Sequence, residues 1–153
     1  MIYGKWCLGL DQAKDALDLR YRVFVEEQGF PADVERDGTD ASAWHLQLYL
    51  EERCVAALRI FREDEETWHL GRLAVEKGYR GQGLGEFALR TACYKALQMG
   101  AKRMRVNAQQ QVQDFYARFG FRPEGEPFME QDCPHVAMET PLPLPSSCHC
   151  GRE

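Results

Sequence analysis

The chain has 153 residues, with 19 Lys and Arg against 24 Asp and Glu, so its formal net charge is −5 at pH 7. This length and the 44% hydrophobic fraction are typical of one globular domain and argue against general disorder. The acidic balance disfavours nucleic acid as a partner, because phosphate binding needs clustered Lys and Arg. No apolar run approaches the roughly 18 residues that span a bilayer, and the first residues lack a secretory signal, so we expect neither membrane insertion nor export.

Six cysteines bear on the compartment and on metal binding: Cys7, Cys54, Cys93, Cys133, Cys148 and Cys150. Without an export signal, we expect reduced thiols in a cytoplasmic protein. The run Cys148-His149-Cys150 suggests zinc, but a tetrahedral site usually takes four ligands, with two or more residues between paired cysteines. We therefore predict no metal. A proline-rich stretch then indicates that the packed domain covers residues 1–141 and that residues 142–153 form a tail.

Residues 12–24 are predicted to form the first helix, because apolar residues recur on one side of it at helical spacing. Asp11 is a candidate N-cap, and Gly29 and Pro31 end the element. The polar residues 32–42 indicate a loop. Two alternating strands follow, over residues 45–50 and 54–62, and are predicted to pair as a hairpin.

A third strand is predicted over residues 68–75, a helix from Leu84 to Met99 with Gly100 as its C-terminal stop, and a strand over residues 103–108. This order of strand, loop, helix and strand favours a right-handed crossover with parallel strands. The remaining predicted elements are a helix over residues 112–119 and two strands over 128–133 and 135–140, turned at 132–134. The fold class is therefore α/β or α+β, with a mixed sheet and helices on its faces.

The segment Arg80-Gly81-Gln82-Gly83-Leu84-Gly85, here called the glycine motif, lies between a predicted strand and a predicted helix. Glycines allow backbone N–H groups to approach a ligand, and a helix N-terminus supplies unpaired donors, so the pattern indicates a phosphate site. No Gly-Lys-Ser or Gly-Lys-Thr follows, which excludes a P-loop. Glu86 stands where a dinucleotide fingerprint needs its third glycine. The alternative interpretation is a glycine-rich turn without a ligand.

The pattern Arg80-x-x-Gly83-x-Gly85 resembles the pyrophosphate-binding motif of the GNAT-type N-acetyltransferases, which hold acetyl-CoA there. Residues 70–75 resemble the family's fourth strand, which pairs with the pantetheine arm. Asn107 and residues 115–121 resemble its next strand and helix, so the matches cover about residues 68–121. The resemblance implies a twisted, mostly antiparallel mixed sheet with a central parallel βαβ unit and flanking helices. It implies coenzyme contacts from Leu73, Ala74, Val75, Arg80, Gly81, Gln82, Gly83, Leu84, Gly85 and Asn107.

The N-terminal third is similar to the ElaA-like branch of these enzymes. The residues that carry this similarity are Arg20, Phe24, Val25, Glu26, Gln28, Glu35, Asp37, Asp40 and His45. Part of the pattern also resembles acyl-homoserine-lactone synthases, which share the fold. Those enzymes usually carry a Trp a few residues after the Phe, and residues 25–30 contain none.

The resemblance implies an acetyl-CoA-dependent N-acetyltransferase in which a primary amine attacks the thioester directly, in a ternary complex. Such an enzyme needs a proton acceptor for the amine and a proton donor for the leaving thiolate. Tyr116 is the candidate acid; its alternative role is that of a core aromatic beside Phe115 and Phe119. His69 is the candidate base, because period-two geometry would place it on one face with Leu73, and its alternative role is that of a half-exposed strand residue.

The acceptor, a small-molecule or peptide amine, is expected to meet an acidic rim containing Glu26 and Glu35. His45 and His135 are further candidates for orienting it. Glu27 and Asp40 are interpreted as ordinary solvated charges. Two other functions stay open: a non-catalytic acyl-CoA sensor, and an enzyme similar to acyl-homoserine-lactone synthases. A homodimer is possible.

Overall fold

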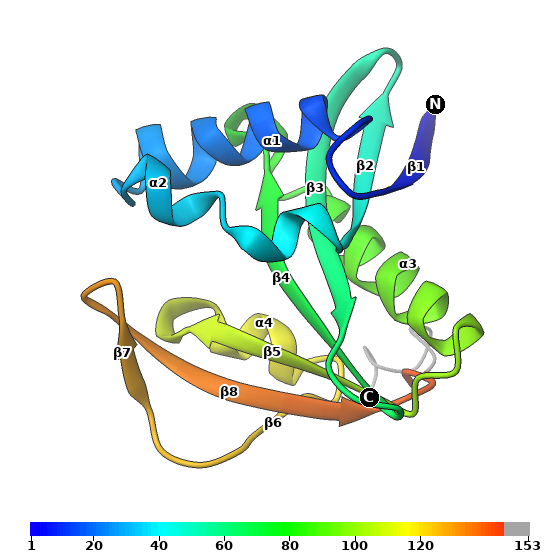
Figure 1. The fold of residues 1–153 in the computed structure, drawn as a ribbon, viewed down its shortest axis with the longest axis vertical. Coiled ribbons are helices and arrows are strands. Elements are labelled where there is room, and N and C mark those ends of the chain that lie inside the picture. Colours follow the sequence, from blue (N-terminus) through cyan, green and yellow to red (C-terminus); the bar gives the residue numbers. More distant parts are fainter. Residues whose placement is uncertain (146–153) are drawn as a thin grey trace. The chain divides into compact units, whose positions relative to one another are not determined.

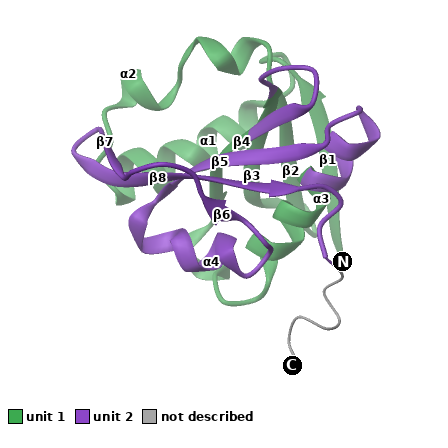
Figure 2. Ribbon diagram, turned by 90° about the horizontal axis from the view of Figure 1, so that it is seen from below, with its two compact units in different colours: residues 1–61, 70–92 green, residues 62–69, 93–153 purple. Residues whose placement is uncertain are grey.

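The computed structural model describes residues 1–145 (Figure 1). The chain divides into two compact units: residues 1–61 with 70–92, and residues 62–69 with the chain from residue 93 onward (Figure 2). The described residues form eight mostly antiparallel strands and four α-helices, so the predicted mixed α/β class is confirmed. Within them, no helix is both long and apolar enough to cross a membrane.

The strands of the first unit follow chain order, and β4 contributes residues to both units. Their bounds are β1 (Ile2–Leu8), β2 (Trp44–Leu50), β3 (Arg53–Arg62) and β4 (Thr67–Val75). β2 pairs antiparallel with β1 on one side and with β3 on the other, which confirms the hairpin predicted from alternation. The sequence-based prediction assigns no element to residues 2–8 and therefore missed β1.

The helices of the first unit differ from the prediction in their bounds and type. They are α1 (Lys14–Arg20), the π-helix η1 (Tyr21–Glu27), α2 (Ala32–Glu35), the 3₁₀ turns η2 (Gly38–Ala41) and η3 (Lys77–Tyr79), and α3 (Leu84–Gln98), which also contributes to the second unit. The predicted first helix therefore continues as a wider π-helix. The loop predicted over residues 32–42 is wrong in part, because it contains two short helical turns. Asp37 and Asp40 form the capping box that starts the second of them.

The start of α1 is held by a residue of β2 and not by Asp11. The N-cap position is Ala13, which makes no side-chain cap hydrogen bond, so the predicted Asp11 cap is wrong. Instead, the Gln47 side-chain oxygen accepts from Ala16 N at 2.8 Å, and its amide nitrogen donates to Gln12 O at 3.1 Å. This satisfies backbone groups at the helix start that have no partner within the helix.

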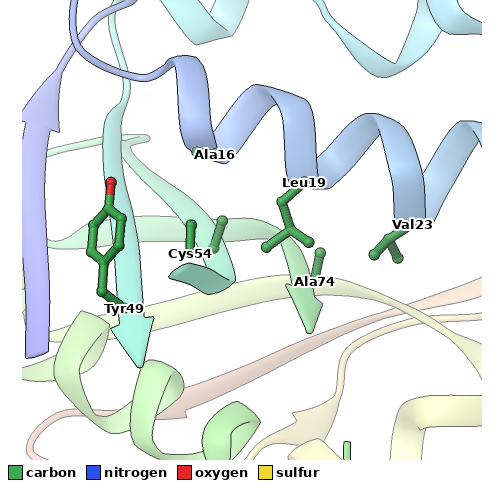
Figure 3. Packing of buried hydrophobic residues seen from close by; sticks show 7 residues of the cluster. Ala16, Leu19, Val23, Tyr49, Cys54 and Ala74 are labelled. Carbon is green, nitrogen blue, oxygen red and sulfur yellow. The ribbon is translucent and has the colours of Figure 1, made fainter. Parts of the chain in front are cut away.

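A hydrophobic core joins the first helices to the sheet of this unit (Figure 3). Its members are Ala16, Leu19, Val23, Tyr49, Cys54, Ala57 and Ala74. Leu19 has no exposed surface, and full burial of a Leu side chain contributes about 1.5 to 3 kcal/mol. Because Ala74 belongs to β4, this packing fixes the strand that leads into the glycine motif.

The second unit contains β5 (Arg103–Gln109), β6 (Arg122–Pro123), β7 (Phe128–Glu130), β8 (Cys133–Pro141), α4 (Gln113–Ala117) and the 3₁₀ turn η4 (Gln110–Val112). β8 pairs antiparallel with β5, β6 and β7. The β7–β8 turn is Gln131–Asp132, where both residues have positive φ, as a two-residue hairpin turn of type I′ requires. The predicted turn at 132–134 therefore shares only Asp132 with the observed one.

Candidate active site

Strand β4 changes its backbone geometry at Arg72, directly before the residues expected to meet the pantetheine arm. Arg72 has φ +55°, a left-handed conformation that costs a non-glycine residue about 1 to 2 kcal/mol. Its side chain is anchored by hydrogen bonds to the carbonyl oxygen of Glu35 (3.1 Å) and to Asp37 Oδ2 (3.2 Å). The prediction that His69 and Leu73 share one face of the strand assumes an extended backbone from residue 69 to residue 73. The left-handed conformation of Arg72 interrupts that extended backbone.

The glycine motif has the backbone that a phosphate cradle needs. Gly81 and Gly83 have φ +82° and +83°, and a Cβ atom built on either would have no neighbour within 4 Å. These glycines are therefore required by backbone conformation and not by crowding. α3 begins at Leu84, immediately after Gly83, and the N–H groups of a helix's first turn have no partner within the helix and carry its positive end. The residues thus fit a phosphate group through main-chain donors.

Arg80 links the motif to two other segments of the same unit. Its Nε donates to the carbonyl oxygen of Val75 at 2.9 Å, which ties the motif to the end of β4. Its Nη1 and Nη2 donate to the two carboxylate oxygens of Glu27, at 2.6 and 2.7 Å. The hydrogen bond to Arg80 lowers the pKa of Glu27, and the same bond raises the pKa of Arg80. Glu27 is therefore a solvent-exposed charge, as interpreted, but it is paired with Arg80.

Three acidic residues of the first unit, Glu35, Asp37 and Asp40, form an ion-pair network with Arg20 and Arg59, and all of these except Asp37 are buried. Arg20, with no exposed surface, donates to Glu35 at 2.7 Å and to Asp40 at 2.8 Å. Arg59 donates to Asp37 at 2.7 Å and to the same Asp40 oxygen at 2.8 Å. Burial alone would raise the pKa of Asp40, but hydrogen bonds and charges from the two arginines hold it well below its usual range. Asp40 is therefore not a solvated charge.

Two predicted acceptor residues belong to this network. Glu35 is 4% exposed and neutralised by arginine, so it does not lie on an exposed acidic rim. His45 has no exposed surface, and its Nε2 lies 3.0 Å from the carbonyl oxygen of Asp40, so this nitrogen carries the proton. Burial lowers the pKa of His45, which favours the neutral ring. Glu26, by contrast, is exposed on η1.

The second unit holds the other candidates, each on a different element. Tyr116, on α4, is 7% exposed, and its ring packs edge-on against Phe115 and Phe121 at centroid distances of 5.1 and 5.4 Å. Burial raises the pKa of its phenol, so the hydroxyl stays protonated near neutral pH. Asn107 is exposed on β5. His69, near the start of β4, is partly buried.

His135, on β8, is held within its own hairpin. It is 6% exposed, stacks on Phe128 with a centroid distance of 5.9 Å, and its Nδ1 lies 2.8 Å from the carbonyl oxygen of Cys133. These contacts stabilise the β7–β8 hairpin and give His135 a structural role, whatever its part in orienting an acceptor.

Among residues 1–145, no group of three or more His, Cys, Asp and Glu side chains could hold a metal ion. The run Cys148-His149-Cys150 lies outside the described residues.

Comparison with known proteins shows the family of this chain. Residues 12–142 match the family model described as an acetyltransferase (GNAT) domain. The chain is 34% identical over 129 residues to the uncharacterized N-acetyltransferase YjcF of Bacillus subtilis, covering 84% of this chain and 91% of that protein. It is 31% identical over 135 residues to the protein ElaA of Escherichia coli, covering 86% and 88%.

Solved structures give the same result. The crystal structure of Escherichia coli ElaA matches with a TM-score of 0.81 and 29% identity, over 92% of this chain and 99% of that one. An acyl-CoA N-acyltransferase from Pseudomonas aeruginosa matches with a TM-score of 0.82 and 29% identity, over 92% and 99%. The chain therefore belongs to the GNAT acetyltransferase family and is similar to its ElaA-like members.

Proposed function

We propose that the protein is an N-acetyltransferase that moves the acetyl group of acetyl-CoA to a primary amine by direct attack in a ternary complex. The observation that carries this proposal is the glycine motif, in which two left-handed glycines open directly onto the first turn of α3. Main-chain N–H groups of residues 82–85 would hold the pyrophosphate, and the backbone of residues 73–75 would pair with the pantetheine arm.

The chemistry asks little of the protein beyond positioning and proton transfer. A thioester is already reactive toward an amine, but a lysine-type amine has a pKa of about 10.4 and is mostly protonated near neutral pH. His69 is our candidate for removing that proton, directly or through water. Glu26 is the exposed carboxylate that would attract the ammonium form of the acceptor.

Tyr116 would donate to the sulfur of the leaving thiolate. Its raised pKa favours a phenol that stays protonated and stabilises the thiolate mainly through a hydrogen bond. Tyr116→Phe keeps the packed ring and removes the donor, so we expect thiol release to fall on the order of 100-fold with little change in stability. An unchanged rate would leave Tyr116 as a core aromatic only.

We also propose that the protein acts in the cytoplasm, where cysteines are kept reduced. Cys7, Cys54 and Cys133 are thiols and not disulfides, which supports a cytosolic site of action.

The deciding experiment measures CoA thiol release from acetyl-CoA over a panel of small-molecule and peptide amines, together with the thermal shift produced by CoA. Amine-dependent thiol release and a raised melting temperature are expected. A thermal shift without turnover on any amine would favour a sensor. Turnover only with S-adenosylmethionine and a longer acyl-CoA, giving a lactone, would favour a synthase. No effect of CoA on melting would overturn the coenzyme site itself.

A further inference from the structure

The guanidinium of Arg80 is already engaged by the protein at all three of its nitrogens. Nε faces the carbonyl oxygen of Val75, and the two terminal nitrogens face the two oxygens of Glu27. A two-pronged contact between arginine and a carboxylate is the same contact that arginine makes with a phosphate. A pyrophosphate that needed this face of Arg80 would have to displace Glu27.

The partner of Arg80 is itself firmly placed. Glu27 is the last residue of η1, and the backbone at this helix end is closed by hydrogen bonds from Gln28 N to Val23 O (3.1 Å) and from Gly29 N to Val25 O (3.1 Å). The carboxylate is therefore presented from a helix end with a fixed backbone, and Arg80 is held at the residue that immediately precedes Gly81.

A second ion pair joins the same two segments. Arg22, also on η1, donates to Glu76 at 2.7 Å, and Glu76 N donates to the carbonyl oxygen of Val55 at 2.8 Å. The π-helix thus contacts the chain between β4 and α3 through two ion pairs. It supplies the arginine in one pair, Arg22, and the carboxylate in the other, Glu27. Only the Glu27 pair involves the arginine of the glycine motif.

From these contacts we propose that Glu27 is a positioning residue for coenzyme binding: it holds Arg80 as a brace that fixes the start of the glycine motif. This inference rests on the proposed function. The pyrophosphate is then bound by main-chain N–H groups of the motif and of the first turn of α3, while Arg80, neutralised by Glu27, sets their positions. Glu27 and Arg80 act as one unit.

The brace and a direct contact between Arg80 and the pyrophosphate predict opposite effects of Glu27→Gln on coenzyme binding. If Arg80 bound the pyrophosphate with its fork, Glu27 would compete for the same nitrogens, and Glu27→Gln would tighten coenzyme binding. If Arg80 is a brace, Glu27→Gln loosens the motif and raises the KM for acetyl-CoA, with kcat at saturating acetyl-CoA retained. We expect a rise of about three- to tenfold.

The test is a double-mutant cycle of Glu27→Gln, Arg80→Gln and the double variant, measuring the KM for acetyl-CoA, kcat and the dissociation constant of CoA. A brace predicts that each single variant weakens binding and that the double variant is no worse than the more damaged single one. Glu76→Gln is the control, because it removes the same charge and the ion pairs of Glu76 with Arg22 and Arg53 but leaves the hydrogen bonds of Arg80 intact. It should change the KM less than twofold.

Three results would overturn the brace: tighter CoA binding by Glu27→Gln, additive effects in the cycle, or an equal loss in Glu76→Gln. If Arg80→Gln fails to fold, as checked by ligand-free melting, the sign of the Glu27→Gln effect still decides. Acetyl-pantetheine, which lacks the pyrophosphate, should be used equally well by all the variants. Failure of the wild-type protein to bind CoA would reject the proposed function, whereas a wild type that binds with cycle results of the wrong sign would reject only the brace.

Discussion

Two sets of arginine–carboxylate contacts in the first unit have similar lengths and opposite surroundings. In the buried network, the Arg20 and Asp40 side chains are 1% and 2% exposed and 2.8 Å apart. At the glycine motif, the Arg80 and Glu27 side chains are 39% and 30% exposed and 2.6 Å apart. A buried charge that loses its partner is strongly destabilising, whereas an exposed pair contributes little to stability. The buried network therefore stabilises the fold, whereas the Arg80–Glu27 pair contributes little to stability and can have a role in coenzyme binding, as proposed above.

The largest expected effect comes from Asp40→Asn. This change leaves Arg20 and Arg59 buried beside a neutral amide, so the free energy of unfolding should fall by about 3 to 5 kcal/mol. Urea unfolding followed by circular dichroism measures it. Asp33→Asn, at an exposed position on α2, is the control and should change stability by no more than about 0.5 kcal/mol. A similar small loss in Asp40→Asn would remove the contrast between the two sets of pairs.

Gly83→Ala tests the motif directly. Space for the methyl group is free, so the cost is the left-handed backbone, about 1 to 2 kcal/mol, and relaxation would displace the first N–H groups of α3. We expect CoA to bind roughly tenfold more weakly by calorimetry. Gly78→Ala, also in open space but without positive φ, should bind CoA like the wild type. If the two variants behave alike, the conformation of Gly83 is not what the site requires.

Acid pH should separate the network from the rest of the fold. The pKa of Asp40 is lowered in the folded state, so its contribution to stability is present above the unfolded value, about 3.9, and is lost as pH falls through the folded value. Stability should therefore rise with pH below about pH 5. In Asp40→Asn that rise should be shallower. Equal slopes would mean that other carboxyl groups carry the acid dependence.

The smallest expected effect is that of Glu27→Gln on the ligand-free protein. Because both partners are partly exposed, its free energy of unfolding should change by no more than about 1 kcal/mol, even where the KM for acetyl-CoA rises. Thermal melting without ligand checks this. A loss as large as that of Asp40→Asn would place Glu27 among the groups that secure the fold.

Local patterns predicted the elements that contain the site. β4, α3 and β5 agree with the sequence-based prediction to within a residue or two, because their alternation and helical spacing lie within short windows. Gly100 stops α3 with φ +98°, as expected for a glycine at that position. The glycine motif is informative for the same reason, since its spacing is local.

Three features of the structure could not be predicted from the sequence: one ion pair, the π-helix and the left-handed backbone of Arg72. They depend on contacts between distant residues or on backbone conformations that the spacing of side chains does not indicate. Glu27 and Arg80 are 53 residues apart, and no spacing rule joins them. The π-helix differs from an α-helix in its backbone hydrogen bonds, so both have the same apolar pattern at this length. The left-handed backbone of Arg72 is held by side-chain contacts to residues 35 and 37, and nothing in the residues around it signals this.

The contact of Gln47 with the start of α1 has a consequence for the order in which the chain folds. α1 and η1 form one continuous helical segment over residues 14–27, a length that is marginal for an isolated helix in water, and the side chain that completes the first turn of α1 comes from β2. A peptide of residues 11–30 should therefore be a random coil. During synthesis, this helix should form only after residue 47 has left the ribosome, so the segment that places Glu27 becomes ordered later than its place in the chain suggests.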